Sequence, residues 1–160
     1  MKQVLLAVGL LLACAVSTSA ADWGSYGNAR FGYWIDIPPG FSKVEESENG
    51  DGGISVSPDG DTELRIWGSH ITEGEFLSEV GLRIDQDKAE GWEITYERKT
   101  RRWASWSGRR SERVMYERAI PLCRDQAAYF QIEYDRSDIE RNGPVVERLV
   151  KSLRSNGECR

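Results

Sequence analysis

Residues 98–110, RKTRRWASWSGRR, hold the densest group of side chains that could bind a ligand. Six of these thirteen residues are Lys or Arg, and two are Trp. Guanidinium groups bind phosphate and carboxylate through paired hydrogen bonds, and indole rings stack on bases and on cations. The stretch is therefore either a surface for nucleic acid or two strands of a sheet whose charges point outward.

The distribution of charge argues against nucleic acid as the partner. Residues 22–97 contain 17 acidic and 5 basic side chains, whereas residues 98–118 contain 2 acidic and 8 basic ones. The rest, residues 119–160, is balanced at 7 and 7. Binding along a nucleic acid needs a positive field over the whole footprint. We expect no nucleic acid partner and interpret residues 98–118 as a local cationic region.

Residue patterns that support catalysis are sparse. The chain has one histidine, His70, and no serine lies in the G-x-S-x-G pattern of a hydrolase nucleophile. Acidic side chains are abundant, so a pair of carboxylates for glycoside hydrolysis is the alternative. We expect a protein that is not an enzyme.

Metal ligands are equally sparse. Zinc sites need four His, Cys or carboxylate ligands, and one histidine with a few cysteines does not supply the usual sets. Residues 47–58 have the composition of a calcium loop, but Ser47 stands where an EF-hand needs aspartate and Pro58 where it needs glutamate. We expect neither a metal nor a cofactor.

Residues 1–21 have the organisation of a secretory signal peptide. A lysine at position 2 precedes an apolar run, and small residues end at Ala20 and Ala21, after either of which cleavage fits. The run is shorter than the roughly 18 to 20 residues that cross a bilayer. We expect a protein of the bacterial periplasm, or a secreted one, whose single mature domain is residues 22–160.

Three cysteines bear on this expectation. Cys14 lies in a sequence that loosely resembles a bacterial lipobox, so a lipid anchor at this residue is the less favoured alternative. Cys123 and Cys159 follow the signal peptide, and an even pair in an oxidising compartment predicts one disulfide. This bond would tie the end of the chain to the body of the domain.

Strands are predicted where apolar and polar residues alternate. The first such run ends at Pro38-Pro39-Gly40, and Asp59-Gly60 between two further runs predicts a hairpin. The predicted strands are residues 31–37, 54–57, 62–67, 94–98, 103–107, 113–120 and 127–134.

Two helices are predicted from apolar residues at helical spacing. Thr72 and Glu75 fit a capping box, which predicts a helix over residues 73–90. A second helix carries a long apolar stripe and begins near residues 142–144. Sequential strands pair as hairpins, so we predict an α+β fold in which two main helices cover an antiparallel sheet of about six to seven strands.

Two segments resemble the PsbP-like fold family. They are RFGYWIDIPPGF, residues 30–41, and YFQIEYDRSDIERNGPVVERLVKSLRS, residues 129–155. In that family a first strand and a last strand followed by a helix bracket an antiparallel sheet sandwiched by helices. The middle of the chain is similar to exported proteobacterial proteins. The resemblance implies an accessory or binding protein, although fold is a weak guide to activity.

The arginine-rich stretch can then be placed on strands. Side chains alternate across a strand, so Trp103 and Trp106 point to opposite faces and at least one of them is expected in the core. A single stacking platform for bases is not expected. The functional interpretation is a cationic patch for an acidic envelope protein or an anionic envelope polymer. Its candidate residues are Arg101, Arg102, Arg109, Arg110 and Trp106.

These observations predict an exported accessory or binding protein of the bacterial envelope that does not act as a catalyst. Two alternatives stay open: a small periplasmic hydrolase that uses carboxylates, and a secreted inhibitor or immunity-type protein. An enzyme needs a deep cleft that gathers titratable side chains, whereas a binding module needs a shallow charged or aromatic surface.

Overall fold

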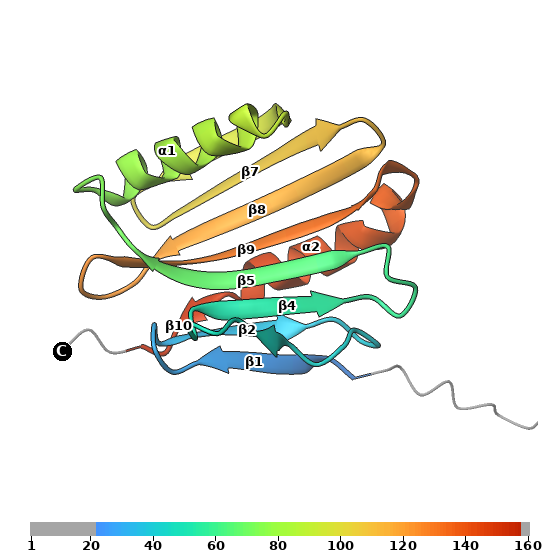
Figure 1. Ribbon diagram of the computed structural model, residues 1–160, viewed down its shortest axis with the longest axis horizontal. Coiled ribbons are helices and arrows are strands. Elements are labelled where there is room, and N and C mark those ends of the chain that lie inside the picture. Colours follow the sequence, from blue (N-terminus) through green and yellow to red (C-terminus); the bar gives the residue numbers. More distant parts are fainter. Residues whose placement is uncertain (1–21, 158–160) are drawn as a thin grey trace, which may run out of the picture.

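The computed structural model describes residues 22–157, in which ten strands form two antiparallel sheets (Figure 1). The large sheet consists, in spatial order, of β3 (Glu45–Glu46), β4 (Gly52–Val56), β5 (Glu63–His70), β9 (Gln126–Asp135), β8 (Arg113–Pro121), β7 (Trp103–Arg110) and β6 (Glu93–Thr100). The small sheet consists of β1 (Gly24–Asn28), β2 (Tyr33–Ile37) and β10 (Arg154–Ser155).

Two helices lie on opposite faces of the large sheet (Figure 1). α1 (Phe76–Ala89) packs over β6 and β7, and α2 (Ile139–Ser152) packs against β2, β8 and β9. Each face of the large sheet has its own buried cluster, and successive residues of β9 belong to them in turn. Tyr129 belongs to the cluster under α1 and Phe130 to the cluster under α2. The predicted α+β arrangement of a seven-stranded antiparallel sheet with two helices is confirmed.

The small sheet shares the α2 side of the large sheet. Tyr33 and Ile35 of β2 join one buried cluster with Leu64 of β5 and Leu149 of α2. The buried residues that the large sheet contributes to this cluster come from β5 and β9, and residues of β8 pack against it. The β6 to β8 half of the large sheet has α1 on one face, while on its other face α2 packs mainly against β8. That second face positions the candidate site described below.

The start of α1 differs from the sequence prediction. The helix begins at Phe76, and the preceding Glu75 makes no side-chain cap. Gly74 has a φ of 79°, a left-handed turn that separates Thr72 from the first helical turn. The carboxylate of Glu79 instead accepts hydrogen bonds from the backbone N–H of Thr72, at 2.8 Å, and of Glu73, at 3.2 Å. The predicted capping box is therefore wrong, and Glu79 fixes this turn.

The start of α2 also differs, because the helical region begins upstream of residues 142–144. A 3₁₀ turn, η1 (Arg136–Asp138), leads directly into α2, and the Asp135 carboxylate accepts a hydrogen bond from the Ser137 N–H at 2.8 Å. This cap begins the turn before the glycine and proline are reached. Pro144 lies inside the helix, where it removes one backbone hydrogen bond.

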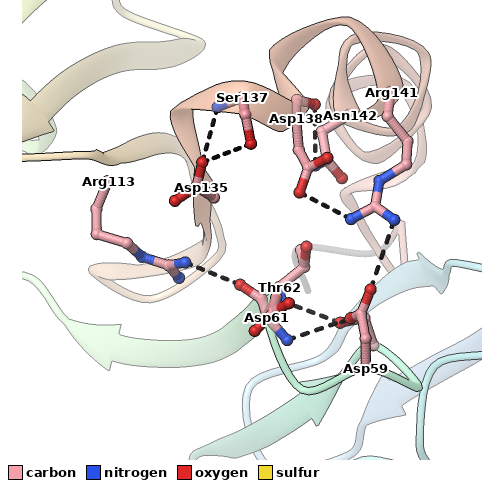
Figure 2. Close-up of polar contacts among 10 residues, drawn as sticks. Asp59, Asp61, Thr62, Arg113, Asp135, Ser137, Asp138, Arg141 and Asn142 are labelled. Carbon is pink, nitrogen blue, oxygen red and sulfur yellow. Dashed lines mark hydrogen bonds and ion pairs between the residues drawn. The ribbon is translucent and has the colours of Figure 1, made fainter.

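A polar cluster ties the β4–β5 turn to the start of α2, as Figure 2 shows. Arg141 of α2 forms ion pairs with Asp59, at 3.5 Å, and with Asp138, at 2.9 Å. Arg113 of β8 donates a hydrogen bond to the Asp61 carbonyl oxygen at 3.0 Å. The aspartates of this acidic turn are thus used as structural acceptors.

Several predictions concern residues outside the described part of the chain. The signal peptide, residues 1–21, the lipidation alternative at Cys14, and Cys159 all lie there. Cys123 lines a small hollow together with Gly32 and Asn156. The Cys123–Cys159 disulfide stays a prediction. Within residues 22–157, no helix has the length and hydrophobicity needed to cross a membrane.

Candidate binding site

The four arginines proposed from the sequence do not form one patch. Arg101 and Arg102 occupy the β6–β7 turn, whereas Arg109 and Arg110 lie at the far end of β7. At about 3.3 Å per residue, the two pairs are separated by roughly 20 Å or more. Arg109 is already paired with Glu93 at 2.8 Å, and Arg110 lies over the Trp92 ring at 4.3 Å.

Trp106 is not part of a surface patch either, because its side chain is 0% exposed. It lies beneath α1, and its indole N–H donates a hydrogen bond to the Asp87 carboxylate at 2.7 Å. A partner at the surface cannot reach this ring. The expectation that at least one indole is in the core is confirmed, and the assignment of Trp106 to a partner surface is corrected.

The opposite face of β6, β7 and β8 exposes a different set of aromatic and cationic side chains. Strand register places them in two cross-strand rows on that face. We call this surface the open face, and its members are Tyr96, Ser107 and Tyr116 in one row, Arg98, Ser105 and Arg118 in the next, and Trp103 beside them.

Trp103 is the centre of the cationic part of the open face. The guanidinium carbon of Arg118 lies 4.3 Å from the centroid of the indole ring, and that of Arg98 lies 5.4 Å from it. These distances are typical of cation–π contacts. Because both side chains contact one ring, two positive charges stand no more than about 10 Å apart on one surface.

Neither guanidinium has a partner of opposite charge. Among residues 22–157, no ion pair includes Arg98 or Arg118. Arg118 donates to the Ser105 hydroxyl at 3.0 Å, but its Nε is buried without an acceptor. Burial lowers the pKa of the Arg118 guanidinium, whose charged form loses hydration. A half-buried positive charge without an anion is the feature that an anionic ligand would satisfy.

The tyrosine row borders a hollow of about 410 Å³. Ser107 and Tyr116 form its floor together with Tyr134, and Arg136 and Ile139 at the start of α2 line it as well. Burial raises the pKa of Tyr116, against the opposing effects of the Ser105 hydroxyl and the Arg118 charge. Tyr96, in the same cross-strand row, is 45% exposed, so one aromatic ring is available for stacking.

Two acids lie behind the open face, under α1. Glu117 of β8 is fully buried and accepts one hydrogen bond, from Gln131 at 3.1 Å. Burial, reinforced by the nearby charge of Asp87, raises the pKa of Glu117 well above its usual value. Burial also raises the pKa of Asp87, although the Trp106 hydrogen bond opposes this shift. Both carboxyls are buried, in the part of the core that lies between α1 and the sheet.

The remaining candidates for chemistry do not converge. His70 ends β5, and its ring stands edge-on to Phe31 with 5.5 Å between centroids. Within residues 22–157, no three His, Cys, Asp or Glu side chains gather as metal ligands do.

Arg98 and Arg118 were not singled out in the sequence. They are twenty residues apart, and only the register of the β6–β7 and β7–β8 hairpins brings both beside Ser105. A signal did exist, because in both hairpins the arginine alternates with a tyrosine two residues earlier, at 96 and 98 and at 116 and 118. Matched Tyr-x-Arg runs in neighbouring strands predict a shared face.

Comparison with known proteins identifies the fold. No protein-family model and no curated protein sequence matches the chain. Cyanobacterial PsbP (CyanoP) from Synechocystis has a similar structure, with a TM-score of 0.66 and 15% identity over 90% of this chain and 98% of that chain. The Ran-binding protein Mog1p of Saccharomyces cerevisiae is also similar, with a TM-score of 0.62 and 10% identity over 86% of this chain and 97% of that chain.

The chain therefore has a PsbP-like fold. The sequence resemblance to that fold family is confirmed. At these identities the likeness concerns the fold alone, and function has to be argued from the residues of the site.

Proposed function

We propose that this protein is a non-catalytic accessory or binding protein of the bacterial envelope, and that its open face binds an anionic partner. The observation that carries the proposal is the pair of unpaired guanidiniums, Arg98 and Arg118, held against Trp103. Charges that already had anionic partners would gain little from a ligand, whereas these two form no ion pair within residues 22–157.

The composition of the open face supports binding over catalysis. It offers arginine, tyrosine, tryptophan and serine side chains, and the acid at the end of β6, Glu93, is engaged by Arg109. That ion pair and its hydrogen bonds lower the pKa of Glu93, so it is a poor proton donor. The Glu93 carboxylate is thus engaged, and the polar and aromatic groups of this surface are of the kind used in recognition.

The location in the envelope follows from the signal peptide predicted for residues 1–21. Mass spectrometry of the protein purified from a periplasmic extract tests it. The expected N-terminus is residue 21 or 22, and a lipid-modified Cys14 at the N-terminus would instead support the anchored alternative.

A labelled polyanion tests the binding proposal. Fluorescein-labelled poly-L-glutamate is titrated with the purified protein, and anisotropy gives the affinity. The double variant Arg98→Glu/Arg118→Glu is expected to bind about tenfold or more weakly, because two charge-assisted hydrogen-bonding groups are lost.

The matched control is Arg101→Glu/Arg102→Glu, which makes the same change of charge in the β6–β7 turn. This control is expected to weaken binding only slightly, because the changed charges are exposed. Added salt screens exposed charges, so it is expected to abolish the small effect of the control before it abolishes the effect of the Arg98/Arg118 variant. Equal losses in the two double variants would show that net charge decides binding, and the assignment to the open face would be wrong.

A further inference from the structure

The chemistry of the anion can be narrowed from the arrangement of Arg98, Ser105 and Arg118. This step rests on the proposed function. The three side chains form one cross-strand row with the small hydroxyl in the middle. Arg118 is fixed by its hydrogen bond to Ser105 and by Trp103, whereas Arg98 is exposed. A half-buried arginine of set position and a movable one therefore flank one point of the sheet.

We propose that this row is a binding site for a doubly charged tetrahedral anion, the phosphate group of a phosphomonoester. The argument is charge complementarity. Two guanidiniums supply two positive charges, and a phosphomonoester carries about −1.5 to −2 at pH 7 with three acceptor oxygens. A carboxylate carries one negative charge and two oxygens, so it satisfies one arginine and leaves the second unpaired.

The unused donors of the row match those oxygens. The Arg118 Nε is buried without an acceptor, and its Nη1 is held by the Ser105 hydroxyl. The Arg98 guanidinium has no ion-pair partner within residues 22–157 and contacts the Trp103 ring. One phosphate group accepting hydrogen bonds from the guanidiniums of both arginines would compensate both charges.

The tyrosine row indicates where the part of the ligand that carries the phosphate group would lie. Tyr96 lies two residues from Arg98 on the same face, and Tyr116 stands in the same relation to Arg118. The phosphate therefore has aromatic surface and the 410 Å³ hollow on one side. A sugar phosphate and a phosphorylated side chain both present this chemistry, and the experiment separates these two sources.

The second ionisation of the phosphate group provides the test, because its pKa is about 6. Glucose 6-phosphate and O-phosphoserine are titrated into the purified protein at pH 5 and pH 7.5 by calorimetry. The affinity of the favoured ligand is expected to rise about tenfold between these pH values as the monoanion becomes a dianion. Binding of glucose 6-phosphate alone would indicate a sugar phosphate, and binding of O-phosphoserine alone a phosphorylated peptide.

Changes in the protein itself have to be separated from those in the ligand. The ionisable groups of the two rows are Arg98, Arg118, Tyr96 and Tyr116. Tyr134, Arg136 and Arg109 line the adjacent hollow, and Arg109 is ion-paired with Glu93 at the end of β7. Sulfate is a dianion over the whole range, and its affinity is expected to stay constant. A parallel rise for sulfate would assign the pH dependence to the protein and overturn the inference.

Variants and a monoanion complete the test. Arg118→Gln and Arg98→Gln are each expected to weaken phosphate binding about tenfold and to abolish its pH dependence, while Arg101→Gln has no effect. Acetate binding as tightly as the phosphomonoester at pH 7.5 would refute the phosphate site. If the phosphate site is refuted but poly-L-glutamate binding still requires Arg98 and Arg118, the proposed function stands without the phosphate site. If neither phosphate binding nor poly-L-glutamate binding depends on these arginines, both proposals are wrong.

Discussion

The two faces of β6, β7 and β8 differ in the charged side chains that they hold and in how these are buried. On the face under α1, Glu117 and Asp87 are buried, and their raised pKa values mean that burial favours the uncharged acid. On the open face, Arg98 and Arg118 contact the Trp103 ring and form no ion pair within residues 22–157. A titratable acid can become neutral when it is buried, but an arginine cannot.

The contrast separates structural from functional tryptophans. Trp106 and Trp103 lie three residues apart in one strand, yet the first ring is enclosed beneath α1 and the second supports two guanidiniums at the surface. Residues on the covered face are therefore expected to control stability, and residues on the open face to control binding. The following measurements test this division, beginning with the largest expected effect.

Replacement of the two tryptophans is the most direct test. Trp106→Ala is expected to lower the free energy of unfolding by about 3–5 kcal/mol, because it leaves a large cavity and removes the hydrogen bond to Asp87. Trp103→Ala is expected to cost about 1 kcal/mol or less, through lost cation–π contacts, while it weakens anion binding. Urea denaturation and poly-L-glutamate anisotropy measure the two properties, and similar stability losses would refute the division.

The pH dependence of stability tests the buried acid. Because the pKa of Glu117 is raised in the folded protein, the folded state holds a proton that the unfolded chain releases above about pH 4.5. Stability from this group is complete below that pH and is lost as the pH rises through the raised pKa. Glu117→Gln keeps a neutral group that can accept from Gln131.

Urea denaturation between pH 4.5 and pH 8 measures the effect. The wild-type protein is expected to lose stability over this range, and Glu117→Gln is expected to lose less, with Asp87 accounting for the remaining slope. Glu133→Gln, on the same strand face as Gln131 but partly exposed, is the control. Parallel curves for the wild type and Glu117→Gln would mean that Glu117 is ionised in the fold.

The smallest effect is expected at the end of β7. Arg109→Ala breaks an exposed ion pair with Glu93, and pairs of this kind contribute little to stability. The unfolding midpoint and the affinity for poly-L-glutamate are both expected to stay unchanged within error. A marked loss of affinity would restore Arg109 to the binding surface, as the sequence alone suggested.

Local patterns predicted the longer strands of the large sheet because alternation reports which face of a strand is buried. They missed β1, whose sequence Gly24–Asn28 has little apolar alternation and which forms a strand by pairing with β2. They also missed β3 and β10, which are two residues each and depend on their neighbours.

The candidate site was harder to predict than the fold. The arginine-rich stretch drew attention to exposed turn residues, since a run of charge is visible in one dimension. The arginines that converge come from different strands and require the hairpin register. Alternation did indicate that Trp103 and Trp106 face opposite ways, and it could not say which of them α1 covers.

Glu117 and Arg118 are consecutive residues that point through the sheet in opposite directions. The carboxyl and the guanidinium lie on opposite sides of the sheet, and an ionised carboxylate would weaken, through the sheet, the positive potential of the open face. The hydrophobic layer beneath α1 raises the pKa of Glu117 and favours the uncharged acid, which limits this loss of attraction for an approaching anion.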